Sequence, residues 1–378
     1  MRLHVIGLGG AGCRIVDRLV ADHDDDPFLS GVSAFDTDME TLDSLRHLAD
    51  DRRYRFGDAA GGDGLGGDLH AGRRLGEAHA EELTRAMDGE RPSTAEAFLL
   101  VLGLGGAAGA GIAPALVERL DTLYDAPTYA LGVLPASEET EPRDPDPGTT
   151  DRIPPRRPLA RKNAARTLDA LSDRADAVFG FDNELWLRSN ESVPEAIPRV
   201  NAVIAERLAG LFGAGETADG VATPQQVLDA SDVARAVGSD GEIAAIGYAT
   251  QGIEPPEPDS RFGFGLFGSS EPATVDASAA VSAIETTIRK AARGKGTIEV
   301  PDGRADRTLL VVGGPPEWLN REAIADGRRW LAEETGSDAI LSGDAPVPDG
   351  EQVFAVVLRS GIDESDRIAA LRESVRTD

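Results

Sequence analysis

The sequence predicts an α/β protein whose N-terminal half is built on a parallel sheet. Two glycine-rich loops carry this prediction, because each follows a short apolar run and precedes a helical pattern; they span residues 7–12 and 103–111. The third observation is a regular alternation of apolar runs with amphipathic segments of helical length. In such a sheet ligands bind at the carboxyl ends of the strands, so both glycine loops are expected at one edge.

The first loop has the spacing G-x-G-x-x-G at Gly7, Gly9 and Gly12. Residues without a Cβ let backbone N–H groups approach an anion, and the dipole of the following helix adds to that attraction. Asp36 ends the next apolar run, where a Rossmann unit keeps its ribose-binding acid. An NAD-binding protein is therefore one interpretation of this half of the chain.

The segment between the loops continues the alternation. A helix with inward leucines is expected after Asp36, then a short strand around 54–56, and the glycine-rich residues 57–67 are interpreted as a linker, with a nucleotide-contacting loop as the alternative. The next helix begins near His70. Its inward side chains are expected to be Leu75, Ala78, Leu83 and Met87.

The second loop precedes a helix with Pro114 in its first turn, where proline is tolerated. Neither loop is followed by Lys-Ser or Lys-Thr, which excludes a Walker-type P-loop, so any phosphate here is held mainly by backbone. Strands follow at 128–134 and 177–181, and the latter ends in the polar residues 182–184. The proline-rich residues 140–159 are interpreted as a solvated loop, with arginines folding over a phosphate as the alternative.

A capping box at Ser192 and Glu195 predicts the start of a long helix that ends near Phe212. Asp229 and Asp232 follow at a spacing of three, which places both carboxylates on one helical face. The remaining segments are expected to form a separate α+β layer. A loop with apolar residues at 262–267 is interpreted as packing on its own domain, with a contact surface as the alternative.

Composition limits the classes of function. The length of 378 residues favours two domains. The net charge of -28 argues against nucleic acid and anionic lipid as partners, and an acidic coat is typical of proteins in a high-salt cytoplasm. The single cysteine, Cys13, excludes disulfides and a cysteine-based zinc site, and no histidines pair at metal-ligand spacing, so no metal site is predicted. No signal peptide or run of about 18 apolar residues is present, so the chain is expected to be cytoplasmic.

The order of these parts resembles the tubulin/FtsZ superfamily over nearly the whole chain, and most closely the archaeal CetZ group. The stretches that carry the resemblance lie at residues 130–135, 162–166, 181–186, 211–216, 246–249 and 311–320. The resemblance implies a Rossmann-like GTPase domain at 1–191, a central helix with its C-terminal turn at 192–220, and an α+β C-terminal domain at 221–378. An acidic catalytic loop begins this last domain.

The resemblance also implies a set of site residues. Backbone N–H groups of the two glycine loops would hold the phosphates of GTP or GDP, with Mg²⁺ accompanying the nucleotide. Glu139 and Asn163 would approach the ribose, and Asn183 and Asn201 would bond the guanine. The implied loop residues are Gly9, Gly10, Ala11, Gly12, Cys13, Arg14, Gly105, Gly106, Ala107, Ala108, Gly109 and Gly111.

In this family the residues corresponding to Asp229 and Asp232 enter the GTP site of the next subunit, so hydrolysis requires a head-to-tail filament. The implied function is a cytoskeletal GTPase that controls cell shape in a haloarchaeon and assembles with itself or with paralogous tubulin-like proteins. Ala107 and Ala108 stand where the family usually has Gly and Thr, and Ile197 replaces an aromatic residue that stacks on the base. These departures support one alternative, a GTP-binding regulator that does not hydrolyse GTP. The NAD-binding protein is the other.

Overall fold

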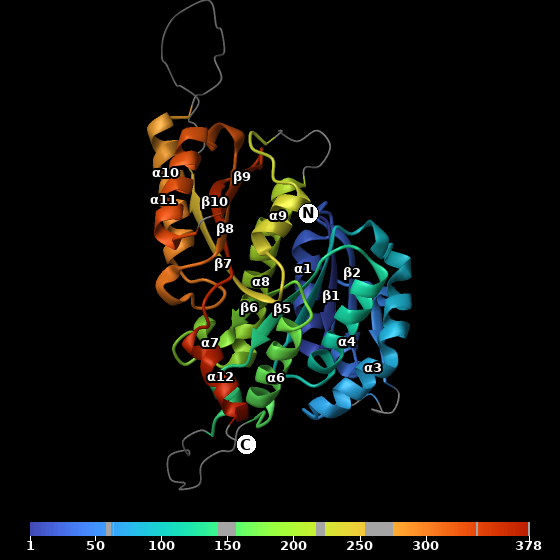
Figure 1. Ribbon diagram of the computed structural model, residues 1–378. Helices are drawn as coiled ribbons and strands as arrows, with labels where there is room; N and C mark the ends of the chain where they lie inside the picture. The colour runs from blue at the N-terminus through green and yellow to red at the C-terminus, as the bar shows by residue number, and fades with distance from the viewer. Residues whose placement is uncertain are drawn as a thin grey trace, which may run out of the picture.

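The structure is a computed structural model that describes residues 1–57, 62, 64–142, 156–216, 224–253, 275–337 and 339–376. The loop at 262–267 lies outside the described residues, as does most of the 140–159 segment and part of the 57–67 segment. Figure 1 shows the described chain as one elongated body, with the long helix α8 running through its centre.

Ten strands form one sheet in the order β3-β2-β1-β4-β5-β6-β7-β10-β8-β9. The first six strands are all parallel and follow the order of a Rossmann fold. The strands are β1 (Leu3–Leu8), β2 (Leu29–Asp36), β3 (Arg53–Arg55), β4 (Ala97–Gly103), β5 (Thr128–Leu134), β6 (Ala177–Asp182), β7 (Glu242–Gly252), β8 (Arg307–Gly314), β9 (Ala339–Pro346) and β10 (Gln352–Ser360). In this strand order the direction of winding reverses between β1 and β4, so a ligand site is expected at their carboxyl ends.

Helices cover both faces of the sheet. They are α1 (Gly9–His23), α2 (Met39–Asp43), α3 (Leu69–Ala86), α4 (Ala108–Leu123), α5 (Ser137–Thr140), α6 (Ala160–Ser172), α7 (Asn183–Trp186), α8 (Val193–Phe212), α9 (Ala230–Val237), α10 (Ala277–Arg293), α11 (Arg321–Thr335) and α12 (Asp366–Arg376).

The buried side chains fall into three clusters. One lies between the sheet and α1, α8 and α9, and a second lies on the opposite face under α4, α6 and α12. The third packs α10 and α11 onto β7, β8 and β10. These two helices are the outer ones at the left of Figure 1. Continuous apolar runs such as Phe98–Leu102 are buried on both faces, as parallel strands under two helical layers require.

The C-terminal strands extend the same sheet, which corrects the expectation of a separate α+β layer. Only three residues of β6 pair with β7, starting at Ala177 and Glu242, and the pairing is parallel. Beyond this joint β10 lies antiparallel between β7 and β8. The second part of the chain is therefore α+β in composition, but backbone hydrogen bonds between β6 and β7 join its strands to those of the first part.

The predicted capping box opens α8, where the backbone N–H of Ser192 donates to Glu195 Oε2 at 2.9 Å. The helix tolerates Pro198 in its second turn and ends at Phe212, as the sequence indicates. Its 20 residues, at about 1.5 Å each, give a length of about 30 Å.

Two helix predictions are wrong in detail. The helix α4 begins at Ala108, so Pro114 lies in its interior rather than in its first turn. In α3 the residue Ala78 is exposed, because the buried face follows Gly72, Gly76 and Ala80 instead. Among the described residues no helix is both long and apolar enough to span a membrane.

Candidate functional site

Two adjoining cavities open at the carboxyl ends of β1, β4 and β5. The larger has a volume of about 460 Å³ and is lined by both glycine loops and the end of β2. The smaller, about 90 Å³, is a slot between α1 and α8. They share Ala11, Arg14, Gly103, Glu139 and Arg157 as lining residues. The pair therefore forms one elongated site with a polar end and an apolar end.

The two glycine loops touch each other at the polar end. Gly9 has φ = 67°, and a Cβ placed there would lie 2.8 Å from the backbone N of Gly109. A Cβ on Gly109 would lie 2.2 Å from the carbonyl oxygen of Leu8. Only glycine fits at both positions, and the contact brings the first turns of α1 and α4 to one cavity. The unpaired N–H groups and positive dipole ends of two helices thus converge on the same space.

Acidic and hydroxyl side chains of the β2–α2 turn form the far wall of the polar end. Asp36 is 3% exposed, and its Oδ1 accepts the backbone N–H of Thr37 at 2.7 Å and of Asp38 at 3.3 Å. Asp38 Oδ2 accepts the hydroxyl of Thr41 at 2.9 Å. Burial raises the pKa of Asp36 to about 6, and the two backbone bonds oppose that rise. The wall therefore presents two carboxylates to the same cavity that Arg14 lines.

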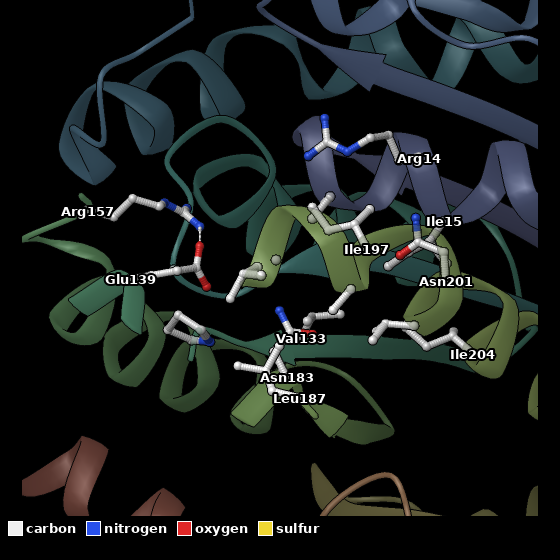
Figure 2. Close-up of a pocket in the computed structure, with 17 residues that line it drawn as sticks. Arg14, Ile15, Val133, Glu139, Arg157, Asn183, Leu187, Ile197, Asn201 and Ile204 are labelled. Atoms are coloured by element: carbon white, nitrogen blue, oxygen red, sulfur yellow. Dashed lines mark hydrogen bonds and ion pairs between the residues drawn. The ribbon is translucent and has the colours of Figure 1, made fainter. Parts of the chain in front are cut away.

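The apolar slot ends in two amide side chains. Asn183 comes from the start of α7 and Asn201 from α8, and both line the slot with Leu187, Ile197 and Val200. Figure 2 shows Asn183, Leu187 and Ile197 around the same space, with Asn201 and Ile204 farther along α8. Apolar walls with a few amides suit a flat heteroaromatic ring.

Glu139 and Arg157 close one side of the site. Arg157 Nη1 donates to Glu139 Oε1 at 3.0 Å, and the backbone N–H of Arg157 donates to the Glu139 carbonyl at 2.9 Å. The other carboxylate oxygen of Glu139 accepts the N–H of Ala136 at 3.1 Å. This ion pair, drawn as a dashed line in Figure 2, places a cation where the two cavities meet.

Four of the expected nucleotide residues lie outside the two cavity linings. Gly12 packs against strand β4, where a Cβ would lie 1.9 Å from the Val101 carbonyl oxygen, and Gly111 packs against Gly72 of α3. Cys13 is fully buried under the first loop, with Sγ 3.7 Å from the Gly7 oxygen, and burial raises its pKa. Asn163 is also buried. Its amide donates to the carbonyls of Gly67 and Gly106, so it braces the loops from behind.

The other expected nucleotide residues line the site directly, divided between its two ends. Most of the expected loop residues, together with Glu139 of α5, line the polar end. They are Gly9, Gly10, Ala11, Arg14, Gly106, Ala107, Ala108, Gly109 and Glu139. The slot adds Gly105, Asn183 and Asn201. Residues from two glycine loops, from α5, from α7 and from α8 are therefore brought together in one place, and the four buried positions support them.

Asp229 and Asp232 lie at the opposite end of α8. Leu228 packs against Gly215, just beyond the C-terminal end of α8, whereas the slot is lined by that helix only from Val193 to Ile204. Figure 1 shows α9 beside the N-terminus, at the end of the molecule opposite α7. Asp229 caps α9 by accepting the backbone N–H of Asp232 at 2.8 Å, and Asp232 contacts Arg235. Within the subunit this acidic pair therefore lies beyond the C-terminal end of α8 and contributes to neither cavity lining.

Sequence reasoning missed several residues of the polar end. These are Thr37, Asp38 and Thr41. Leu65 and Arg157 also line the polar end, and they come from the two segments for which contact with the nucleotide or its phosphates is the alternative interpretation. The signal is partly present, because the β2–α2 turn follows a buried strand at the same sheet edge as the glycine loops. Among the described residues no group of three or more His, Cys, Asp or Glu side chains is placed to hold a metal ion by itself.

Comparison with known proteins gives the family. The profile described as the Tubulin/FtsZ family, GTPase domain, matches residues 2–147, and that of the tubulin-like CetZ C-terminal domain matches residues 190–377. The tubulin-like protein CetZ5 of Haloferax volcanii is 36% identical over 99% of this chain and 91% of its own length.

Two solved structures are similar over the full chain. CetZ1 from Haloferax volcanii, a GDP-bound monomer, has a TM-score of 0.83 and 30% identity, and covers 100% of this chain and 99% of its own. CetZ2 from the same organism, a GTPγS-bound protofilament, has a TM-score of 0.81 and 29% identity, with 100% and 98% covered. Since sequence and structure agree over the full length, the chain belongs to the CetZ group of the tubulin/FtsZ family.

Proposed function

We propose that the elongated site binds GTP and GDP, with the phosphates at the polar end and the guanine in the slot. The observation that carries this proposal is the convergence of two helix N-termini on one cavity that continues into an apolar slot with two amides. Membership of the CetZ group supports it, because CetZ1 and CetZ2 of Haloferax volcanii are described with GDP and GTPγS bound. The same membership argues against the NAD-binding alternative.

The base is recognised by Asn183 and Asn201. An amide offers both a carbonyl acceptor and an NH₂ donor, so two amides complement the N1–H, N2 amine and O6 of guanine. Ile197 and Val200 supply apolar contact on the ring face where an aromatic residue would stack. Adenine presents a donor where guanine has O6, so it is a poorer fit.

The phosphates are held by backbone N–H groups of both loops and by cationic side chains. Arg14 and Arg157 both line the polar end. Mg²⁺ prefers one or two carboxylates together with phosphate oxygens, and Asp36 and Asp38 offer that donor set on the opposite wall. When bound there, Mg²⁺ would neutralise the phosphate charge beside these carboxylates.

Hydrolysis and assembly follow from the position of the acidic pair. Asp229 and Asp232 follow the C-terminal end of α8, whereas the site of their own subunit is lined by α8 only from Val193 to Ile204. A head-to-tail contact would bring them to the site of the next subunit, where a carboxylate can orient and deprotonate water. We infer GTP-dependent filaments in the cytoplasm that act in cell shape, formed by this chain with itself or with paralogues.

A second candidate function, a GTP-binding regulator that does not hydrolyse GTP, is favoured by one observation. Both carboxylates are already engaged in capping α9, and Asp232 also contacts Arg235. Release of these contacts at an interface would be required for catalysis.

The test is phosphate release from GTP in molar KCl with Mg²⁺, measured over a range of protein concentrations, with pelleting of the same samples. The GTPase predicts activity per subunit that rises with concentration together with pelleting. GTP binding without turnover would support the regulator. Binding of NAD in preference to GTP would overturn both.

A further inference from the structure

Arg367 in the C-terminal helix α12 bonds to two loops of the nucleotide site without lining either cavity. Its Nη2 donates to the Pro135 carbonyl at 2.5 Å and its Nη1 to the Ser137 hydroxyl at 3.4 Å. Its Nε lies 3.5 Å from Asp182 Oδ2. The side chain is 21% exposed, so this guanidinium is largely removed from water.

Each acceptor belongs to an element that carries a site residue. Pro135 lines the slot, and Ser137 begins the short helix α5 that carries Glu139. Asp182 caps α7, because its Oδ1 accepts the N–H of Glu184 at 3.0 Å, and α7 begins with Asn183. Arg367 therefore spans the ribose side and the base side of the site.

A further bond joins the same two elements directly. Glu184 Oε2 accepts the backbone N–H of Ser137 at 2.6 Å. Together with Arg367 it closes a ring of polar contacts that links α5, α7 and α12. Figure 1 shows α12 beside α6 and close to α7 at the lower end of the molecule.

We propose that Arg367 is a positioning residue that fixes Glu139 and Asn183 relative to one another and so sets the selectivity of the site for guanine. This rests on the proposed GTP site. A planar guanidinium holds its two hydrogen-bond acceptors and its ion-pair partner Asp182 in a fixed arrangement, whereas an ammonium group is a flexible point charge. Small displacements of a recognising group cost affinity steeply.

The same helix offers a matched control. Arg372 also bonds from α12 to the nucleotide domain, to Asp169 on α6 at 2.8 Å, and it contacts Glu364 at 3.1 Å. Asp169 lies outside both cavity linings. A general loosening of α12 should therefore follow from Arg372→Ala as well as from Arg367→Ala, but only the latter should alter selectivity.

The experiment compares the affinities of GTP and inosine triphosphate, which lacks the guanine amine, for the full chain and its variants in molar KCl. Arg367→Ala is expected to lower the ratio of the two affinities at least about fivefold, and Arg367→Lys to restore less than half of that loss. Arg372→Ala should leave the ratio unchanged. Urea unfolding of each variant reports its stability separately.

The outcomes separate two failures. No binding of GTP by the unaltered chain would overturn the proposed function and this inference with it. GTP binding with an unchanged ratio in Arg367→Ala, or full restoration by lysine, would overturn the positioning role alone. If Arg367→Ala does not fold, Asp182→Asn serves instead, because asparagine keeps the cap of α7 but weakens the contact with Arg367, and the same loss of ratio is expected.

Discussion

Asp36 is a buried carboxyl group at the wall of a cavity suited to phosphate. Burial of a charge is costly, and the raised pKa of about 6 expresses that cost. Its Oδ1 is satisfied by two backbone N–H groups, which explains how the turn keeps an acid there. The charged group is therefore unfavourable for stability and suited to a cation that arrives with the nucleotide.

We expect Asp36→Asn to stabilise the nucleotide-free protein at neutral pH. Because the folded pKa of about 6 exceeds the ordinary value of 3.8, the folded state binds more protons between these values, and stability falls as pH rises through that window. The amide oxygen can keep the hydrogen bond from the Thr37 N–H. Above pH 6 the variant's free energy of unfolding should therefore exceed that of the unaltered protein by an amount of the order of 1–3 kcal/mol. Urea unfolding at pH 4 and pH 7.5 measures it, and an equal gain at both would contradict the assignment. The same variant should bind Mg²⁺–GTP more weakly.

Asp232→Asn tests the acidic pair. The amide can still take part in the cap of α9, so folding and GTP affinity should be kept, while turnover in the filament falls about a hundredfold. Phosphate release and nucleotide binding measured on one preparation provide the check. Loss of GTP binding by the folded variant would place Asp232 in its own subunit's site instead.

Residue types at the site are predictable only in part. The glycine spacing indicates a phosphate loop, but Gly12 and Gly111 serve close packing, and the sequence pattern does not distinguish the two uses. Asn163 and Cys13 are expected at the nucleotide yet lie behind the loops, since side-chain direction depends on the tertiary packing of α1 and α6.

At the scale of elements, the contact between α3 and α4 shapes the second glycine loop. A Cβ on Gly72 would lie 2.0 Å from the carbonyl oxygen of Ala107, and one on Gly76 would lie 2.6 Å from the Cα of Ile112. The two helices therefore approach backbone to backbone. The loop at the start of α4 is held from outside by α3.

Gly72→Ala should displace Ala107 and the start of α4. We expect a loss of about 2 kcal/mol or more in the free energy of unfolding, together with weaker GTP binding. Gly89→Ala is the control, because no atom lies within 4 Å of a Cβ there. Denaturant unfolding measures the stability of both variants. If Gly72→Ala is as stable as Gly89→Ala, the α3–α4 contact can accommodate a methyl group and the prediction is wrong.

Most elements are predictable because their signals are local. Capping residues and an apolar face define α8, and apolar runs define β4 and β5. The prediction for Ala78 fails because it follows the pattern of large apolar residues. The buried face of α3 is instead formed in part by glycines, which that pattern does not include. Pro114 misleads about the start of α4, since nothing local reports that the helix begins inside the glycine loop.

At the scale of the whole molecule, the sheet order of the second half is beyond prediction from sequence. The three-residue joint between β6 and β7 and the place of β10 between β7 and β8 depend on contacts between segments far apart in the chain. The parallel sheet of the first half follows from the alternation and the glycine loops. The family resemblance predicts that Asp229 and Asp232 lie away from their own subunit's site. In the structure they lie beyond the C-terminal end of α8, whereas that helix lines the site with its N-terminal part.

The net charge of -28 predicts that assembly depends on salt. Like-charged subunits repel one another, and the Debye length falls from about 10 Å at 0.1 M to about 3 Å at 1 M salt. Pelleting with GTP should therefore increase over this range of KCl. Circular dichroism at each salt concentration checks that the subunit stays folded, and undiminished pelleting of folded protein at low salt would refute the repulsion argument.

The single thiol has a practical consequence for experiments. Cys13 is fully buried beneath the first glycine loop, so a thiol-reactive dye should leave the folded protein unlabelled. A cysteine introduced at an open surface position would then take one dye per subunit. In long incubations Cys13 could react only when the loop opens, so the rate of that reaction would measure loop opening. A lower rate in the presence of a nucleotide would report occupancy without a labelled ligand.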